Sequence, residues 1–441
     1  MATGGAHNQA ALVGYRFGRS AAASTRDSST VHMMEPSCRL FIPIRHAHGR
    51  HQVLRALFSL AIGSMTACGG ADSPPTMDST AVSDTGATDG VSTTVITDEP
   101  SCESCTIELL RVATLGDTAL PGGLSDEAGV WAGGDGRFYV IDVVVAPSRV
   151  LVYDSIGRYV TAFGRSGSGP GEYAVPVRVM SRGPDTIQVV ALPRRLTTIL
   201  TRDHSVARIE RLPLDLMDHA ILGDGTLVIN GILRTREAIG YPLHRLGDSL
   251  EVLASFGTDD PRFDPTDAAQ PWRSRRALAP AGGDRFWAAP PNRFSAELWD
   301  ADGNRIRRLV RNVAWFQPWT NGWAPWIAPP PPRLWSIRQD DAGILWVVVH
   351  VPDPNWRRIP ARQTNIPDHE KHMPVDYHEF YDTVVEAWDL SGGRFLTSLR
   401  SDFRMKGFLY GGLLYSARED EVGNYFYDVW KLTLTHTRGG D

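Results

Sequence analysis

Pairs of turns, nearly all of which contain glycine, recur along the chain, and their spacing constrains the fold more than any other feature. Short runs rich in Val, Leu, Ile, Phe and Tyr lie between the turns. In the first four pairs the two turns are about 20 residues apart: Gly136 with Gly157, Gly183 with Asp203, Gly225 with Gly247, and Gly283 with Gly303. Two turns at this distance fit one antiparallel unit of four short strands, and repetition of such units is typical of a β-propeller.

Two further units complete the count. In the fifth unit Gly343 and Gly392 are further apart, because residues 352–378 form an insertion. A second insertion, rich in Trp and Pro, covers residues 315–335. The sixth unit has its first turn at Gly423, and the chain ends too soon after it to supply a fourth strand. Without the insertions, six units average about 47 residues each, which is a normal length for a propeller repeat.

A strand for the incomplete sixth unit is available near the start of the repeats. Residues 106–112 have a strand-like sequence and precede the first complete unit. If they pair beside residues 430–435, the ring closes between the two chain ends and no sheet edge stays open. We therefore predict an all-β fold over residues 102–441, a six-bladed β-propeller of four-stranded antiparallel blades closed by this N-terminal strand.

The amino-acid composition agrees with many short strands, and the net charge limits the classes of partner that the protein could bind. The chain has 42 Gly and 30 Pro, which disfavour long helices, and 42% hydrophobic residues, which suffice for a large core. Its net charge of −5 makes neither nucleic acid nor an anionic membrane surface an obvious partner. Clusters such as Arg273, Arg275 and Arg276 could bind anions, but a general preference for arginine over lysine explains them equally well.

The N-terminal part resembles an export signal. Three arginines in residues 45–55 precede an apolar run at 56–67, which is long enough for a signal peptide and too short to span a bilayer. Residues 65–68, Met-Thr-Ala-Cys, resemble the lipobox of bacterial lipoproteins. This resemblance implies lipidation of Cys68 and, because no Asp follows it, an outer-membrane location. Ordinary secretory cleavage after Ala67 is the alternative.

Three segments therefore divide the chain. Residues 1–68 are an upstream segment with a lipoprotein signal peptide, and residues 69–101 are an acidic linker without Lys or Arg, whose composition predicts disorder. Residues 102–441 form the propeller. We expect the protein to be exported and held at the cell envelope by its lipid anchor.

One blade carries a recognisable motif. Residues 129–179 contain Gly-Ser-Gly-Pro-Gly-Glu-Tyr-Ala-Val-Pro at 167–176 and resemble an NHL-type repeat with its link between blades. The Asn that this family usually has between its second and third strands is absent from residues 143–149. The resemblance implies a six-bladed fold and little about the ligand. The glycines of residues 164–171 suit a tight crossing between blades better than a phosphate site, because no helix follows them.

Cys102 and Cys105 are the only cysteines of the predicted propeller. One Cys-X-X-Cys pair cannot complete a tetrahedral zinc site without two further ligands. In an oxidising compartment we expect the two cysteines to form a small disulfide.

The two insertions contain the candidate binding residues. Trp315, Trp319, Trp323 and Trp326 could form a platform for sugar rings or a partner protein, or they could belong to a loop packed on the body. His369, His372, Asp376 and His378 could ligate a metal, although a hydrophilic surface loop explains them as well.

No recognised catalytic motif occurs in the chain, so we expect a non-enzymatic binding or scaffold protein that engages a protein or glycan through propeller loops, without a cofactor. The alternative is a hydrolase or lyase that uses a divalent metal in the centre of the propeller.

Lipidation of Cys68 is directly testable. We expect cells that express the wild-type protein to incorporate labelled palmitate into it, and the Cys68→Ala variant to incorporate none, because the thiol is the acceptor of the lipid. Equal labelling of the two proteins, measured after immunoprecipitation, would contradict the lipobox interpretation.

Overall fold

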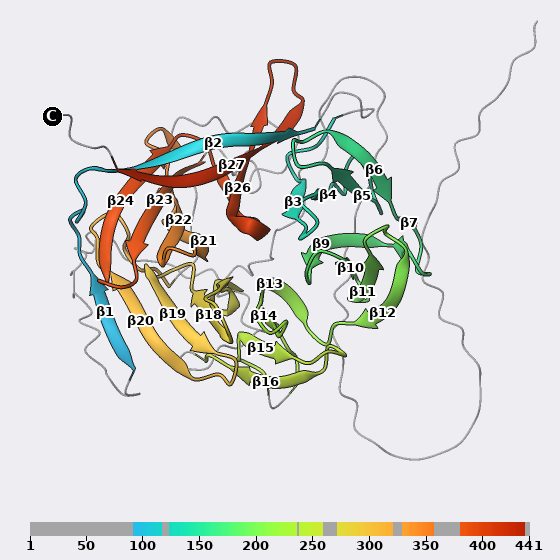
Figure 1. The fold of residues 1–441 in the computed structure, drawn as a ribbon, viewed down its shortest axis with the longest axis horizontal. Helices are drawn as coiled ribbons and strands as arrows, with labels where there is room; N and C mark the ends of the chain where they lie inside the picture. The colour runs from blue at the N-terminus through green and yellow to red at the C-terminus, as the bar shows by residue number, and fades with distance from the viewer. Residues whose placement is uncertain are drawn as a thin grey trace, which may run out of the picture. The chain divides into compact units, whose positions relative to one another are not determined.

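The computed structural model describes residues 91–116, 123–235, 238–258, 271–320, 329–356 and 380–436. Within these residues, six antiparallel sheets of four strands surround a common centre, which confirms the predicted six-bladed β-propeller (Figure 1). The short helical elements are the 3-10 turns η1 (Pro271–Ser274) and η4 (Tyr410–Gly412). No helix in the described ranges has the length and apolar character needed to cross a membrane.

The first half of the ring contains blades 1 to 3, whose strands follow one another from the innermost to the outermost. Blade 1 contains β3 (Gly129–Ala132), β4 (Phe138–Ile141), β5 (Val150–Tyr153) and β6 (Tyr159–Phe163). Blade 2 contains β9 (Val175–Ser181), β10 (Thr186–Leu192), β11 (Leu196–Thr201) and β12 (Val206–Arg211). Blade 3 contains β13 (Asp215–Ile221), β14 (Leu227–Ile232), β15 (Leu243–Leu246) and β16 (Val252–Phe256).

The second half of the ring repeats the pattern. Blade 4 contains β17 (Ala277–Pro280), β18 (Arg285–Ala289), β19 (Ser295–Asp300) and β20 (Arg305–Arg311). Blade 5 contains β21 (Arg333–Gln339), β22 (Ile344–Pro352), β23 (Tyr381–Asp389) and β24 (Arg394–Ser401). Blade 6 contains β25 (Met405–Phe408), β26 (Leu413–Glu419), β27 (Tyr425–His436) and β2 (Cys105–Leu115).

Several hairpin turns share one local geometry, which explains the glycine periodicity. In the turn after β21, the Asp340 carboxylate accepts the backbone N–H groups of Ala342 and Ile344 at 3.0 and 2.9 Å. Gly343 between them has a φ of 77°, a left-handed conformation that glycine adopts without strain. The same arrangement recurs at Asp154, Asp300 and Asp420. An aspartate followed three residues later by glycine therefore marks these turns.

The predicted ring closure is confirmed, with one difference in blade 6. Strand β2 pairs with β27 in antiparallel register, and Thr106 lies opposite Thr435 while Arg111 lies opposite Trp430. The prediction that Gly423 lies in the first turn of the sixth unit is wrong. Strand β25 precedes β26, so the Gly423 turn joins the second and third strands. β25 is only four residues long and was not recognisable from hydrophobic pattern.

The hydrophobic core consists of six layers, one between each pair of neighbouring blades. Strand β22 shows how one strand contributes side chains to two core layers. Leu345, Val347 and Val349 pack toward blade 4, whereas Trp346 and Val348 pack toward blade 6. Because successive side chains of a strand point to opposite faces, a sheet buried on both faces requires a nearly continuous apolar run.

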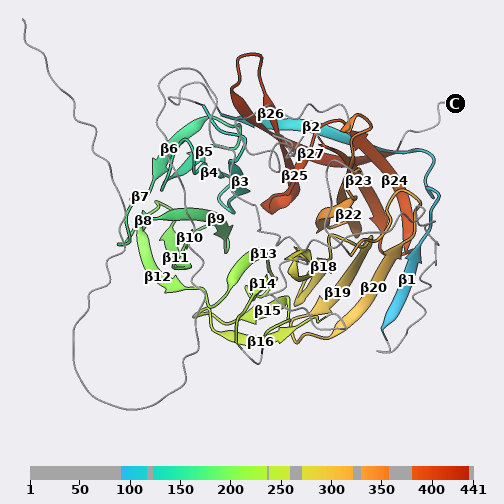
Figure 2. The same cartoon turned by 180° about the vertical axis from the view of Figure 1, so that it is seen from behind.

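Residues 91–101 differ from the predicted linker. Thr93, Thr94, Val95 and Ile96 belong to β1 (Ser92–Ile96), which pairs in parallel with β20 as a fifth strand on the outside of blade 4 (Figure 2). The β-branched residues in this stretch favour a strand, and β20 offers a free edge for pairing. The linker prediction is therefore wrong at its C-terminal end; residues 69–90 lie outside the described residues, as does the signal segment 1–68.

The glycine-rich link after blade 1 has a structural role. Strands β7 (Arg165–Ser166) and β8 (Glu172–Tyr173) pair in parallel across it. The Glu172 carboxylate accepts the backbone N–H groups of Ser168 and Gly169 at 3.0 and 2.9 Å. The Glu172 carboxylate thus occupies the position that an anion would take in this turn. These hydrogen bonds, of which the one from Gly169 has the largest effect, lower the pKa of Glu172.

The ring has two distinct sides. We call the turn face the side with the turns that join the first strand to the second and the third to the fourth, such as those at Gly343 and Gly393. We call the loop face the side with the connections between second and third strands and the links between blades. The connection 312–332 joins β20 of blade 4 to β21 of blade 5, and the connection 353–380 joins β22 to β23, so the strand ends that flank both predicted insertions lie on the loop face.

A buried ion pair joins blades 4 and 5. Arg311 of β20 and Glu386 of β23 have side chains that are 3% and 2% exposed, and the Arg311 Nε lies 2.8 Å from the Glu386 Oε2. Trp388 Nε1 donates to the same oxygen at 2.7 Å. Arg311 also donates to the carbonyl oxygens of Thr97 and Asp98, which follow β1. Burial raises the pKa of Glu386, and the Arg311 charge opposes this shift.

Removing one partner of this pair tests its contribution. We expect Glu386→Ala to lower the free energy of unfolding by roughly 3–5 kcal/mol, because it leaves the buried Arg311 guanidinium with only the exposed Asp98 carboxylate, at 3.9 Å, as a counter-charge. The exposed Asp154–Arg158 pair is the matched control, and Arg158→Ala should leave the free energy of unfolding nearly unchanged, because an exposed ion pair contributes little to stability. Denaturant unfolding of the two variants measures the difference; equal losses would contradict a structural role for the buried pair.

Candidate functional site

The loop face around blade 5 contains the described part of the predicted tryptophan platform. Trp315 is 41% exposed, and its ring packs against Phe294 at a centroid distance of 5.2 Å. Trp319 is half-buried, and its Nε1 donates to the Pro332 carbonyl oxygen at 2.8 Å. Trp323 and Trp326 lie outside the described residues, as do the proposed metal ligands His369, His372, Asp376 and His378.

Trp319 is held in place by blade 4 and by the start of blade 5. Its carbonyl oxygen accepts the Asn292 Nδ2 at 2.8 Å, and its backbone N–H donates to the Asn292 carbonyl oxygen at 3.3 Å. The Arg333 guanidinium carbon lies 5.8 Å from the centre of the Trp319 ring and 5.5 Å from that of Tyr381. These distances are within the range of cation–π contacts.

A second tryptophan on the same face is in contact with two guanidinium groups. Trp335, at the start of β21, donates from its Nε1 to the Lys406 carbonyl oxygen at 2.9 Å. The Arg275 guanidinium carbon lies 4.2 Å from the centre of the Trp335 ring, and that of Arg404 lies 5.2 Å from it. We call Arg275, Trp319, Arg333, Trp335 and Arg404 the arginine–aromatic cluster. Arg275 is exposed and the other four residues are half-buried.

His350 forms the floor of this cluster. The ring is 1% exposed, stacks on Trp335 at 4.8 Å and donates from Nε2 to the Met405 carbonyl oxygen at 2.8 Å. Burial, followed by the Arg404 charge, holds the pKa of His350 well below its ordinary value of 6.5. The imidazole is therefore neutral near pH 7, and it supports the cluster from below rather than adding charge to it.

The cluster can bind a ligand by two kinds of contact. Indole faces stack against apolar surfaces, including the faces of sugar rings. Guanidinium groups donate paired hydrogen bonds to carboxylates and phosphates, and they also stack on aromatic rings. A ligand with flat apolar faces and anionic groups would use both.

Nearer the centre of the ring, the polar groups are engaged with one another. Arg178 of β9 contacts Asp218 at 3.2 Å and His219 at 3.3 Å, both on β13. The other Asp218 oxygen accepts the backbone N–H of Leu278 in β17 at 3.0 Å. Burial, followed by the Arg178 charge, lowers the pKa of His219 to about 3. These contacts link blades 2, 3 and 4, which gives them a structural role.

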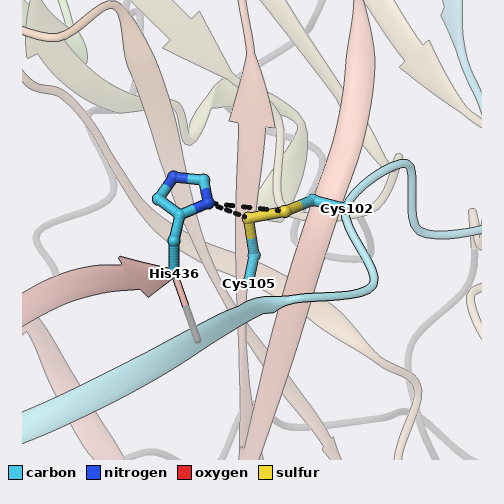
Figure 3. A group of neighbouring side chains, drawn as sticks. All are labelled: Cys102, Cys105 and His436. Atoms are coloured by element: carbon cyan, nitrogen blue, oxygen red, sulfur yellow. Dashed lines mark hydrogen bonds between the residues drawn. A yellow bond between two sulfur atoms is a disulfide. The ribbon is translucent and has the colours of Figure 1, made fainter. Parts of the chain in front are cut away.

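A second group of side chains lies on the turn face, where the ring closes. Cys102 and Cys105 form a disulfide, and the His436 Nδ1 lies 3.4 Å from the Cys105 Sγ and 3.8 Å from the Cys102 Sγ (Figure 3). In the ladder of β2 and β27, Cys105 lies directly opposite His436. Within the described residues, these three form the one group of at least three metal-capable side chains.

The disulfide borders a cavity between blades 5 and 6. This cavity has a volume of about 640 Å³. Its polar lining includes Cys102, Cys105, Asp340, Arg394 and His436, and its apolar lining includes residues of β22, β24 and β27.

Sequence reasoning missed His436, Arg333 and Arg404, and it singled out Arg275 only as part of an arginine run that could bind anions. The predicted pairing of residues 106–112 with 430–435 pointed to the neighbourhood of His436, and the observed register places Cys105 opposite it. Arg275 and Arg404 come from links between different blades, and no spacing in the sequence indicates that they meet at Trp335.

No protein family model matches the chain, and no curated protein matches it. Solved structures with a similar fold include a candidate exported protein of Bacteroides fragilis, at 11% identity and a TM-score of 0.48, with 78% of this chain and 99% of that chain covered. A DUF4221 family member of Bacteroides vulgatus is similar at 10% identity and a TM-score of 0.48, with 75% and 99% covered. A virginiamycin B lyase of Staphylococcus aureus is similar at 11% identity and a TM-score of 0.36, with 75% and 100% covered. At these identities the likeness concerns the fold alone, and the NHL-type resemblance of residues 129–179 stays a prediction.

The neutral state of His350 predicts a dependence of stability on pH. Because the folded-state pKa is depressed, the unfolded chain binds a proton that the folded protein does not, so stability falls as the pH drops below 6.5. His350→Gln retains a donor for the Met405 carbonyl oxygen and removes the titrating ring. We expect the free energy of unfolding of this variant to fall less steeply as the pH drops than that of the wild type. The two slopes should differ by up to about 1.4 kcal/mol per pH unit. Urea unfolding from pH 6.5 to about 5 measures both slopes, and parallel slopes would contradict a neutral buried His350.

Proposed function

We propose that the protein is a non-enzymatic binding or scaffold protein of the bacterial cell envelope, and that it holds its ligand on the loop face. The observation that carries this proposal is the arginine–aromatic cluster, in which Arg275 and Arg404 both contact the ring of Trp335 and Arg333 contacts that of Trp319. Trp, Tyr and Arg are the residues that most often dominate binding energy at interfaces.

The chemistry of the cluster favours an acidic ligand with flat apolar faces. A glycan that contains uronic acids has both features, since its sugar rings can stack on indole and its carboxylates can bind guanidinium groups. An acidic segment of a partner protein would offer the carboxylates with fewer stacking faces. We therefore place a carboxylate-bearing glycan first and a protein second.

The path of the N-terminal segment supports this use of the loop face. β1 runs parallel to β20, so Ser92 lies at the turn-face end of blade 4 and Ile96 at the loop-face end. A chain that is anchored through a lipid on Cys68 would reach the propeller at the outer edge of its turn face. The loop face would then point away from the membrane, where a ligand can approach it.

The proposal is tested by binding of the full-length protein to immobilised polysaccharides, with uronic-acid polymers compared with neutral ones. We expect binding to the acidic polymers and a Kd at least about tenfold higher for Arg275→Ala and for Trp319→Ala, because each removes one contact type of the cluster.

Arg158→Ala is the matched control, since Arg158 is an exposed arginine in a turn of blade 1 on the opposite face. It should bind as the wild type does. Equal affinity of all three variants would show that the arginine–aromatic cluster is not part of the binding site. Binding of an acidic peptide but of no polysaccharide would assign the site to a protein partner.

A further inference from the structure

The disulfide at the ring closure brings three metal-capable atoms together. The Sγ atoms of Cys102 and Cys105 and the Nδ1 of His436 lie within 4.8 Å of one another. The antiparallel ladder of β2 and β27 fixes this arrangement, because it places Cys105 opposite His436 at the last pair of the register. The register thus fixes the backbone of His436 beside Cys105, and the exposed His436 side chain reaches the two sulfur atoms from there.

The distances between sulfur and nitrogen fit a tetrahedral metal centre, whereas the two bonded sulfur atoms have to separate after reduction. A zinc ion lies about 2.3 Å from a thiolate sulfur and about 2.0–2.1 Å from an imidazole nitrogen, so tetrahedral angles place sulfur and nitrogen about 3.5 Å apart. The observed separations between the His436 Nδ1 and the two Sγ atoms are 3.4 and 3.8 Å. The imidazole therefore already stands where a third ligand is needed, and the pair of cysteines supplies the other two once it is reduced.

We propose that the reduced protein binds one Zn²⁺ through the thiolates of Cys102 and Cys105 and the Nδ1 of His436. All three residues line the cavity between blades 5 and 6, so the fourth coordination position opens into this cavity and holds water. The site lies on the turn face and does not depend on the proposed ligand of the loop face. Thiolate and imidazole ligands in tetrahedral geometry favour zinc among the common divalent ions.

Formation of the site is a redox step followed by a ligand exchange. A phosphine and one water reduce the disulfide to two thiols and yield the phosphine oxide. The two thiols then release two protons as they form two bonds to Zn²⁺, so affinity for the metal rises with pH. The disulfide and the metal centre exclude each other, which makes the ring closure sensitive to the redox state of its surroundings.

Cobalt(II) is the probe that tests this proposal. The full-length protein is prepared with Cys38→Ser and Cys68→Ser, so that Cys102 and Cys105 are its only thiols. After reduction with a phosphine and anaerobic desalting, we expect one Co²⁺ per chain, with a thiolate-to-cobalt charge-transfer band, visible bands of tetrahedral cobalt and displacement by Zn²⁺. The oxidised protein should show none of these bands.

Two histidine variants decide whether His436 is a ligand. His436→Ala should lower the affinity for Co²⁺ by more than the roughly 100-fold that loss of an outer-shell partner costs. His436→Asn repeats the test with a polar side chain, and circular dichroism checks that both variants keep the fold. His204→Ala, in the second turn of blade 2, is the matched control and should bind as the wild type does. Absence of the charge-transfer band in the reduced protein, or an unchanged affinity in both His436 variants, would overturn the proposal.

Discussion

The pairing of β2 with β27 is the constraint on which the rest of the structure depends. It joins residues near the start of the propeller to the last strand of the chain, with Cys105 opposite His436 at one end and Leu115 opposite Tyr427 at the other. Closing so long a loop carries an entropic cost, which the buried contacts on both sides of blade 6 offset. Without β2, strand β27 would present an open edge, and the core layers next to blade 6 would lose Ile107, Ala113 and Leu115. The register of this one pair also places His436 opposite the disulfide.

Regular turns and strands buried on both faces made most of the fold predictable, and the short strands without these features were missed. Turns with an aspartate and a left-handed glycine repeat at fixed distances, so the blade count and the closing strand could be predicted from sequence. Residues 92–96 and β25 escaped prediction, because short strands at an outer edge or at the centre lack the apolar runs of a doubly buried strand. The prediction of a linker over residues 69–101 relied on composition, and composition does not reveal that β20 offers an edge to residues 92–96.

The two candidate sites were predictable to different degrees, for a physical reason. Trp315 and Trp319 could be identified as binding candidates because a cluster of tryptophans in a long connection is visible in the sequence. The arginines that contact Trp335 come from links of blades 3 to 4 and 5 to 6, and only the closed ring brings Arg275 and Arg404 to the same indole. His436 lies one residue beyond the segment 430–435 that was predicted to pair with residues 106–112. A contact set by strand pairing can thus be reached from sequence, whereas one set by the convergence of several blades requires the structure.

Blade 5 relates the two sites to each other. Trp335 stands at the loop-face end of the hairpin formed by β21 and β22, while Asp340 and Trp346, joined by a hydrogen bond of 2.8 Å, stand at its turn-face end beside the cavity. Between these ends, β22 is buried on both sides by the core layers of blades 4 and 6. Close-packed cores of this kind have low compressibility, so the hairpin holds its two ends at a fixed separation. The arginine–aromatic cluster and the proposed redox-dependent metal site therefore lie on opposite faces of the propeller, and the hairpin of β21 and β22 extends from one to the other.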